Sequence, residues 1–426
     1  MANKRRPKKT KPPYRKYVGG VGFTHTQGFG DGQINNDTCV DEKFKQLTLE
    51  ENQLCNKHTL QQFTLQTITI DPKEYSGMKL PLEVFSIIIS MMEVQDIKTN
   101  VLLVCRAWYL MCIPRLYHTP VLTSRNFSRF VDTVLGDRKR KTCEHVLHLD
   151  LSPIIQSGKN SYVSKILRRC SKNLVSFTAP QTSFGIAPLI SLKSCHHLKY
   201  LDLGLVSETV NLKELFLAIK NFHELTHLSF PRSSIECEGY QEFEWPPNLQ
   251  YLKLSGGISN EFVQETVFPN TIKILEFSFC PQINEHSIYT VLAKIGDNLT
   301  QLYFHYPMPA LKDNSLDYVF RYCSNLKVLQ LMIDYCTKWV FSEHFFTQLP
   351  YPRPLKTLIL ECSGHLGQTF KIHPDDLTIA IYEGRLPCLK TVRISSRLGW
   401  DSHNDDVSDL VSCFEDKNSG SIYITY

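Results

Sequence analysis

The sequence predicts an α/β solenoid that follows a short helical segment and a basic N-terminal tail. Two observations support this class. A six-residue pattern, L-x-x-L-x-L with aliphatic or aromatic substitutions allowed, recurs ten times between Val146 and Leu389. The stretches between copies place apolar residues three and four apart, which is the spacing of an amphipathic helix. We therefore expect about ten strand-helix repeats over residues 145–426, including a C-terminal cap.

Residues 1–77 are polar and glycine-containing with little apolar periodicity, so they predict a disordered tail. Residues 1–17 hold eight of the 47 Lys and Arg residues and no acid, leaving 39 basic against 42 acidic residues in the remainder. A nuclear-import signal is a candidate function of this run, with Lys4, Arg5, Arg6, Lys8, Lys9 and Lys11 as its residues. A purely solubilising tail fits equally well.

Composition narrows the class of protein. No apolar run reaches membrane-spanning length and no secretory signal precedes the tail, so we expect the cytoplasm, the nucleus or both, and no membrane partner. The 14 cysteines form no CxxC pair of zinc-ligand spacing, so we expect buried thiols and no metal or other cofactor. Specific nucleic-acid binding is not expected, because no base-reading element accompanies the basic run.

The helical segment occupies residues 78–120. Leu80-Pro81 predicts a helix start, because Pro in a first turn costs no hydrogen bond. Apolar residues follow at helical spacing: Val84, Ile87, Ile88 and Met91. Asp96 is expected to cap a second helix bearing Ile97, Val101, Val104, Cys105 and Trp108. Pro114 is expected to stop or bend that helix before a third short element at Leu116-Tyr117.

A connecting helical segment is expected over residues 121–144, before the repeats. The ten copies begin at Val146, Leu174, Leu198, Leu225, Leu249, Ile272, Leu299, Leu326, Leu355 and Leu389. Alternation within each copy predicts a strand whose leucines share one face. Stacked copies would form one core, with strands on the concave side and helices outside. We expect insertions after Leu355, and the pattern leaves open whether "SGSIYITY" adds a capping strand.

Residues 275–304, "LEFSFCPQINEHSIYTVLAKIGDNLTQLYF", resemble the cysteine-containing subtype of leucine-rich repeat. Residues 321–331 resemble the helix end and strand start of the same subtype. The resemblance implies that Cys280 and Cys323 fill the core. Asn284 becomes a candidate helix N-cap. The other copies depart from this subtype but keep the repeat.

The order of residues in 78–118 resembles the F-box, and an F-box followed by leucine-rich repeats is a known family architecture, here of fungal type. The matching residues are Leu80, Pro81, Val84, Ile88, Asp96, Val104, Cys105, Arg106, Trp108, Leu116 and Tyr117. The family implies docking on the adaptor subunit of an SCF (Skp–cullin–F-box) ubiquitin ligase, and through it on the cullin. The expected adaptor-binding residues are Leu80, Pro81, Val84, Ile88, Val104, Trp108 and Leu116. The alternative is that these residues only pack the segment against the first repeats.

The repeats would then hold a protein substrate on their concave face. If the leucines point inward, the strand positions between and after them face the partner: Tyr200, Asp202, His227, Ser229, Tyr251, Lys253, Glu276, Gln301, Tyr303, His305, Gln330, Thr357, Glu361 and Arg393. Among these, the candidate substrate-binding residues are Tyr200, Asp202, His227, Tyr251, Lys253, Tyr303 and Arg393. Aromatic residues mixed with polar groups suit a protein partner rather than a phosphate pocket.

A catalytic function is not indicated, because no GxSxG, GxGxxG, GxxxxGK or HExxH motif is present. "HPDD" (373–376) and "HNDD" (403–406) place His beside acids in expected loops. The first hypothesis is a non-catalytic substrate receptor of a ubiquitin ligase, which promotes degradation by holding target and ligase together. The second is an interaction protein that binds the adaptor without ubiquitination. The third, nucleic-acid binding by residues 1–17, predicts steeply salt-sensitive binding.

Overall fold

The computed structural model describes residues 14–15, 25–26, 81–97, 99–136, 142–155, 158–235, 237–342, 353–365, 367, 371–400 and 404–425. The described chain divides into two compact units. The helical unit contains 81–120 and 142–146, and the solenoid unit contains 121–136 and 147–425. Within residues 1–77, β1 (Tyr14–Arg15) pairs antiparallel with β2 (His25–Thr26). The rest of that tail, with its expected disorder and import residues, lies outside the described residues.

The solenoid unit contains a parallel sheet of 11 strands, with the order β15-β14-β13-β12-β11-β10-β9-β7-β5-β4-β3. Its strands are β3 (His148–Asp150), β4 (Ser176–Thr178), β5 (Tyr200–Asp202), β7 (His227–Ser229), β9 (Tyr251–Ser255), β10 (Ile274–Ser278), β11 (Gln301–His305), β12 (Val328–Met332), β13 (Thr357–Glu361), β14 (Thr391–Ser395) and β15 (Ser421–Thr425). The ten predicted strands are all present. The terminal segment left open by the sequence adds the eleventh, β15, which pairs parallel with β14.

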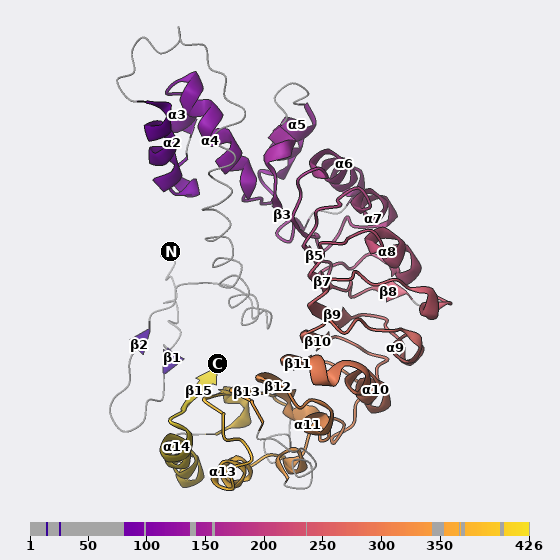
Figure 1. Ribbon diagram of the computed structural model, residues 1–426, viewed down its shortest axis with the longest axis vertical. Helices are drawn as coiled ribbons and strands as arrows, with labels where there is room; N and C mark the ends of the chain where they lie inside the picture. The colour runs from indigo at the N-terminus through magenta and orange to yellow at the C-terminus, as the bar shows by residue number, and fades with distance from the viewer. Residues whose placement is uncertain are drawn as a thin grey trace, which may run out of the picture. The chain divides into compact units, whose positions relative to one another are not determined.

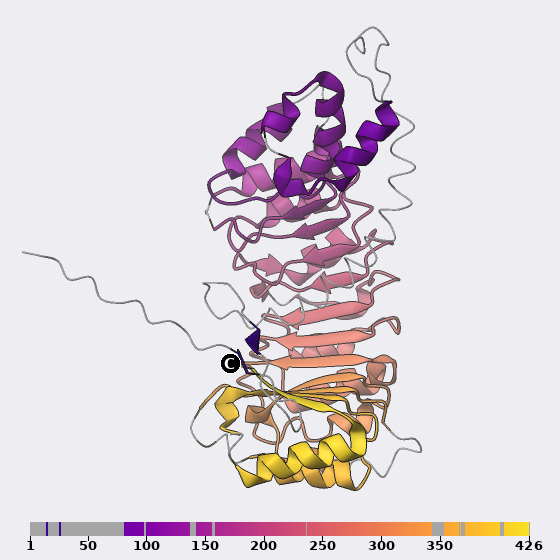
Figure 2. The same ribbon diagram turned by 90° about the vertical axis from the view of Figure 1, so that its left-hand side faces the viewer.

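The strands stack one above another along the unit, as Figure 2 shows. The three apolar positions of every copy are at most 2% exposed, from Val146 in the first to Ile394 in the last. Equivalent residues stack across neighbouring strands: the rings of Phe277 and Phe304 lie 5.4 Å apart and almost parallel. Burying such positions is the main source of stability, because no single copy can cover its own apolar face.

Helices cover the outer side of the sheet and the strands line the inner side of the curve (Figure 1). The helices are α5 (Phe127–Gly136), α6 (Asn160–Cys170), α7 (Ile186–Leu192), α8 (Leu212–Ile219), α9 (Asn260–Glu265), α10 (Glu285–Ile295), α11 (Val319–Tyr322), α13 (Pro374–Tyr382) and α14 (Asp405–Asn418). Short 3-10 turns complete the repeats: η4 (Tyr240–Glu242), η5 (Gly296–Asn298), η6 (Ile333–Tyr335), η7 (Lys338–Phe341) and η8 (Ser396–Leu398). A second sheet pairs β6 (Val210–Asn211) with β8 (Ser234–Ile235).

The repeat containing α10 follows its expected pattern. Asn284 caps the helix, since its Oδ1 accepts a hydrogen bond from the Ser287 N–H at 3.0 Å. Cys280 and Cys323 are buried at 0% and 1% exposure. Burial raises the pKa of the Cys280 thiol to about 12, so it stays protonated. These predictions are confirmed.

Over residues 314–323, where apolar residues recur at helical spacing, the helix α11 covers only Val319–Tyr322. Asp317, just before it, accepts hydrogen bonds from the N–H and the hydroxyl of Thr337. "HPDD" begins a helix rather than lying in a loop: His373 caps α13 in a capping box with Asp376. In "HNDD", Asn404 caps α14. The segment from β13 to α13, residues 362–373, is longer than its counterpart 279–284, consistent with the expected insertion.

The helical unit consists of α2 (Leu82–Met91), η2 (Val94–Asp96), α3 (Thr99–Leu102), α4 (Arg106–His118) and η3 (Thr142–His145). Helix α2 follows Pro81 as expected. The prediction of one continuous second helix from Ile97 to Trp108 is wrong. The backbone at Cys105 is extended, and the Cys105 sulfur accepts a hydrogen bond from the Trp108 N–H, so Cys105 caps a separate helix, α4. Of the stop or bend expected at Pro114, the stop is wrong, and Leu116 and Tyr117 lie in the same helix rather than in a third element. Helix α4 runs through Pro114 to His118, and Arg115 in the last turn donates to the Met92 carbonyl at 2.8 Å.

Candidate protein-interaction sites

One face of α2 is apolar and exposed. Val84, Ile87, Ile88 and Met91 follow one another at helical spacing and are 36%, 53%, 38% and 79% exposed. The opposite side of the helix points inward: Ile89 is 2% exposed. Helix α2 therefore has two apolar sides and uses only one of them in the core of its own unit.

The turn between α3 and α4 exposes further apolar residues of the same unit. Leu103 and Val104 are 75% and 60% exposed. The set of exposed aliphatic residues, which we call the apolar helical surface, is Val84, Ile87, Ile88, Met91, Val94, Leu103, Val104 and Leu110. Exposed apolar residues gathered on one small unit are typical of a protein-binding surface.

The core beneath this surface is small. It contains Ile89, Ile97 and Cys112, and the half-buried side chains Val101, Leu102, Trp108 and Met111 pack against it. The ring of Trp108 meets the ring of Phe85 edge to face, at 5.6 Å between centroids. Partial burial lowers the pKa of Arg115, opposed by the nearby Cys112. A core of this size cannot also bury the aliphatic residues outside it.

The predicted adaptor-binding residues differ in their exposure to solvent. Pro81, Val84, Ile88 and Val104 are exposed, whereas Trp108 and Leu116 are half-buried in α4. Leu80 lies outside the described residues. The structure adds Ile87, Met91 and Leu103 to the exposed set. The sequence could have indicated Ile87 and Met91, because they lie three and seven residues after Val84. The exposure of Leu103 could not be predicted in this way, because it follows from the break between the helices α3 and α4.

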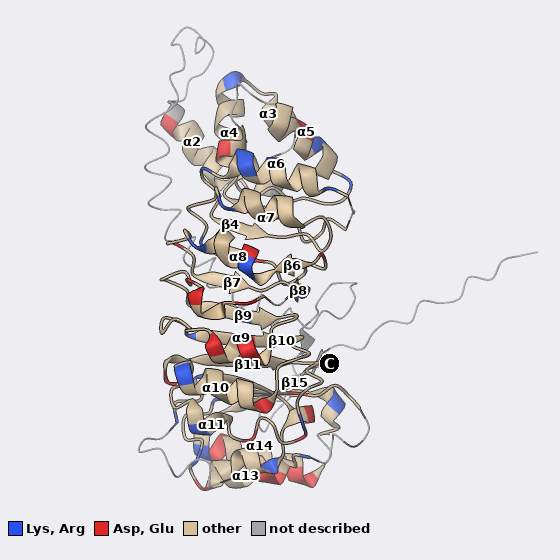
Figure 3. Ribbon diagram, turned by 90° about the vertical axis from the view of Figure 1, so that its right-hand side faces the viewer, with Lys and Arg blue, Asp and Glu red and all other residues tan. Residues whose placement is uncertain are grey.

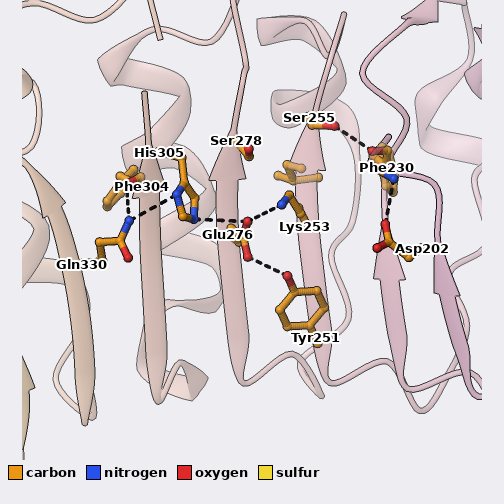
Figure 4. A network of polar contacts seen from close by, with 12 residues as sticks. Asp202, Phe230, Tyr251, Lys253, Ser255, Glu276, Ser278, Phe304, His305 and Gln330 are labelled. Atoms are coloured by element: carbon orange, nitrogen blue, oxygen red, sulfur yellow. Dashed lines mark hydrogen bonds and ion pairs between the residues drawn. The ribbon is translucent and has the colours of Figure 1, made fainter. Parts of the chain in front are cut away.

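The concave face of the solenoid holds a polar network centred on Glu276 of β10, drawn in Figure 4. Glu276 is 2% exposed. Its Oε1 lies 2.7 Å from Lys253 Nζ and 3.2 Å from His305 Nε2, and its Oε2 accepts a hydrogen bond from the Tyr251 hydroxyl at 2.6 Å. Gln330 extends the network, donating to the Phe304 carbonyl at 3.1 Å. A buried carboxylate is tolerated only with such partners.

The network sets the protonation of its members. Burial alone would raise the pKa of Glu276, but the hydrogen bond and charge of His305 and the charge of Lys253 outweigh it and lower the pKa. Burial, together with the adjacent carboxylate of Glu276, raises the pKa of Tyr251. Glu276 is therefore ionised and Tyr251 protonated near neutral pH. The network joins side chains of strands β9, β10 and β11.

A row of neighbouring rings leads from this network toward the N-terminal strands. The rings of Tyr200 and His227 lie 5.9 Å apart, and those of His227 and Tyr251 lie 5.6 Å apart. Burial lowers the pKa of His227 to about 4, so the imidazole is neutral near pH 7. Asp202 lies beside this row, with its Oδ2 3.5 Å from the Tyr200 hydroxyl.

The leucine positions of each copy are buried, as the predicted register requires, and the concave candidates are the strand positions between and after them. Among the candidate substrate-binding residues, Tyr200, Asp202, His227, Lys253 and Arg393 are half-buried. Tyr251 and Tyr303 are 8% and 5% exposed and offer little area. Their binding function stays a prediction. The sequence placed Glu276, His305 and Gln330 on this face, but not the bonds between them, because those depend on distances across strands.

In the described part of the chain, no group of three or more His, Cys, Asp or Glu side chains is arranged to hold a metal ion. No described helix has both the length and the apolar character needed to cross a membrane.

Comparison with known proteins adds independent evidence. No family model matches the chain. The "F-box protein YDR306C" of Saccharomyces cerevisiae is 52% identical over 485 aligned positions that cover 100% of both chains. "Protein pof5" of Schizosaccharomyces pombe is 33% identical over 76% of this chain and 91% of its own length.

Solved structures give weaker likenesses. The complex of Rad7 and Elc1 in yeast contains a chain with a TM-score of 0.41 and 12% identity, covering 92% of this chain and 95% of that one. The leucine-rich repeat-containing protein LegL7 from Legionella pneumophila has a TM-score of 0.35 and 12% identity, covering 66% and 90%. Neither likeness bears on function at such scores. The full-length relationship to the first relative and the repeats described above show that the chain belongs to the F-box proteins with leucine-rich repeats.

Proposed function

We propose that this protein is a non-catalytic substrate receptor of an SCF-type ubiquitin ligase. Its helical unit docks on the adaptor subunit, and its solenoid holds a protein substrate for ubiquitination. The observation that supports this most is the apolar helical surface, which folding of the unit leaves exposed.

The energetics favour an interface at this surface. Covering one exposed aliphatic side chain contributes about 1 to 2 kcal/mol, and Ile87, Met91, Leu103 and Val104 are each more than half exposed. A few such anchors carry most of the affinity of a typical complex. The substrate would meet the concave face, whose preorganised network limits the entropy lost on binding. Joining both partners on one chain raises their effective concentration.

Purification of the full chain from cells tests the docking step. We expect adaptor and cullin to accompany the unaltered chain and to be lost from a Leu103→Glu/Val104→Glu variant. The matched control is Ile186→Glu/Val267→Glu, which puts the same charges on solenoid residues that are 65% and 75% exposed. Recovery of the adaptor by the helical-unit variant, or its absence from the unaltered chain, would refute the proposal.

A second step distinguishes the receptor from the alternative, an interaction protein that binds the adaptor without ubiquitination. Proteins retained by all three versions are substrate candidates, and their half-lives are measured in cells that carry each version. A half-life lengthened only by Leu103→Glu/Val104→Glu supports the receptor. Unchanged half-lives with intact adaptor binding support the alternative.

A further inference from the structure

A row of lysines lies along the edge of the large sheet where strands β10 to β14 begin. The Thr300 N–H donates to the Lys273 carbonyl at 2.8 Å, and the Lys327 N–H donates to the Thr300 carbonyl at 2.7 Å. The Lys356 N–H donates to the Lys327 carbonyl at 2.8 Å, and the Lys390 N–H donates to the Lys356 carbonyl at 2.9 Å. These bonds fix the five residues in one line. We call Lys273, Lys327 and Lys356 the lysine row.

The three side chains of the lysine row are exposed. Across the described residues their ammonium groups form no ion pair or side-chain hydrogen bond. Lys390 differs, because its ammonium group donates to the carbonyl of Asn418.

Few acids lie near the row. In the described segments that lead into these strands, 266–273, 296–300, 323–327, 353–356 and 383–390, the acids are Asp297 and Glu383. Asp297 accepts a hydrogen bond from the Ser324 hydroxyl at 2.9 Å, and Glu383 pairs with Arg385. Over these described segments the edge therefore carries more positive than negative charge.

An anion bound at this edge would offset the repulsion between like charges. Lys327 and Lys356 precede the paired strands β12 and β13, and neighbouring strands lie about 4.8 Å apart. The outer helices differ, since they carry acidic as well as basic residues (Figure 3). The lysine row is thus a local departure in a chain whose residues beyond the tail have nearly balanced charge.

The neighbouring positions indicate the kind of anion. The residues that follow the row in the same strands are uncharged, and Ile274 and Val328 among them are half-buried. Such a strip offers apolar and polar contacts to a polypeptide backbone. The positions of the row and of this strip contain no aromatic ring on which a nucleic-acid base could stack. The observations therefore favour an extended acidic protein segment over nucleic acid.

We propose that the lysine row binds an extended acidic segment of the substrate, an inference that rests on the receptor function proposed above. The segment crosses strands β10 to β13 at their N-terminal edge and places carboxylates beside the ammonium groups. Substrates would then be selected by an acidic stretch in addition to their contacts on the concave face.

Fluorescence anisotropy with the full chain tests this proposal. The probe is a labelled peptide of about twelve alternating Glu and Ser residues, long enough to cross the row. The comparison probes are the Gln-Ser peptide and an oligothymidylate of equal length. The row variant is Lys273→Ser/Lys327→Ser/Lys356→Ser. The control is Lys165→Ser/Lys213→Ser/Lys312→Ser, which removes the same charge from exposed positions outside the row and keeps the basic tail.

We expect the row variant to raise the Kd for the acidic peptide at least about tenfold and the control to change it less than about twofold. Added salt should weaken binding of the unaltered chain. Equal binding by row variant and control overturns the proposal, as does tighter row-dependent binding of oligothymidylate. Adaptor recovery is measured with the same variants. Its absence from the unaltered chain refutes the receptor function, whereas its retention with unchanged peptide binding refutes only the lysine row.

Discussion

The two units differ in how far they bury their apolar residues. In the solenoid, every leucine-type position of the ten copies is at most 2% exposed. In the helical unit, Met91 and Leu103 are 79% and 75% exposed, although the unit has a core around Ile89. Folding of the solenoid accounts for its apolar pattern, whereas folding of the helical unit leaves part of its pattern unexplained. A binding partner is the simplest physical reason for that remainder.

The largest expected effect in this comparison is the loss of the carboxylate at Glu276. Glu276→Leu removes the anion that Lys253 and Tyr251 contact, so we expect the free energy of unfolding to fall by about 3 to 5 kcal/mol. Urea denaturation followed by circular dichroism measures it. The double variant Glu276→Leu/Lys253→Met should recover much of the loss. If the single change costs less than about 1 kcal/mol, the network does not stabilise strands β9, β10 and β11.

A matched pair of aliphatic truncations sharpens the contrast between the units. Leu252→Ala in β9 removes a fully buried side chain, and we expect a loss of about 3 kcal/mol in unfolding free energy. Ile87→Ala removes a side chain that is 53% exposed and should change stability by less than about 0.5 kcal/mol. Similar losses at both sites, by the same denaturation assay, would show that Ile87 serves the core.

The low pKa of His227 predicts acid sensitivity of the solenoid. Unfolded histidine binds its proton near pH 6.5, while folded His227 does so near pH 4. The unfolded state therefore takes up more protons between these values, and stability falls as pH decreases from 6.5 toward 4. We expect His227→Phe to remove about 1 to 3 kcal/mol of this loss. Thermal melts at pH 7 and pH 5 compare the two chains. An unchanged difference between the two melts would contradict the assigned pKa.

A smaller effect concerns the end of helix α9. The Lys294 ammonium donates to the carbonyls of Val263, Gln264 and Thr266 at 3.0, 2.7 and 3.0 Å. Lys294→Met should lower the free energy of unfolding by about 1 to 2 kcal/mol, because these terminal carbonyls lose a cationic donor. The exposed Lys165→Met is the control in the same denaturation experiment. Equal values for both would mean that solvent replaces the ammonium group.

Sequence periodicity predicted the solenoid well because its pattern is local. Each strand and its buried face follow from alternation within six residues, and each of the ten copies contributes a strand to the sheet as expected. The helical unit was predicted less well. The extended backbone at Cys105 and the continuation of α4 through Pro114 depend on contacts such as Arg115 with Met92. The network around Glu276 likewise requires side-chain distances between strands, which no single-strand pattern contains.

The measurement that tests the account most directly is titration of purified adaptor into the unaltered chain and into Met91→Ser/Val104→Ser, with unfolding free energies measured for both. We predict a Kd raised at least about tenfold, with stability changed by less than about 0.5 kcal/mol. An unchanged Kd together with a stability loss of more than about 2 kcal/mol would show that these residues serve packing, and would contradict the assignment of an interface.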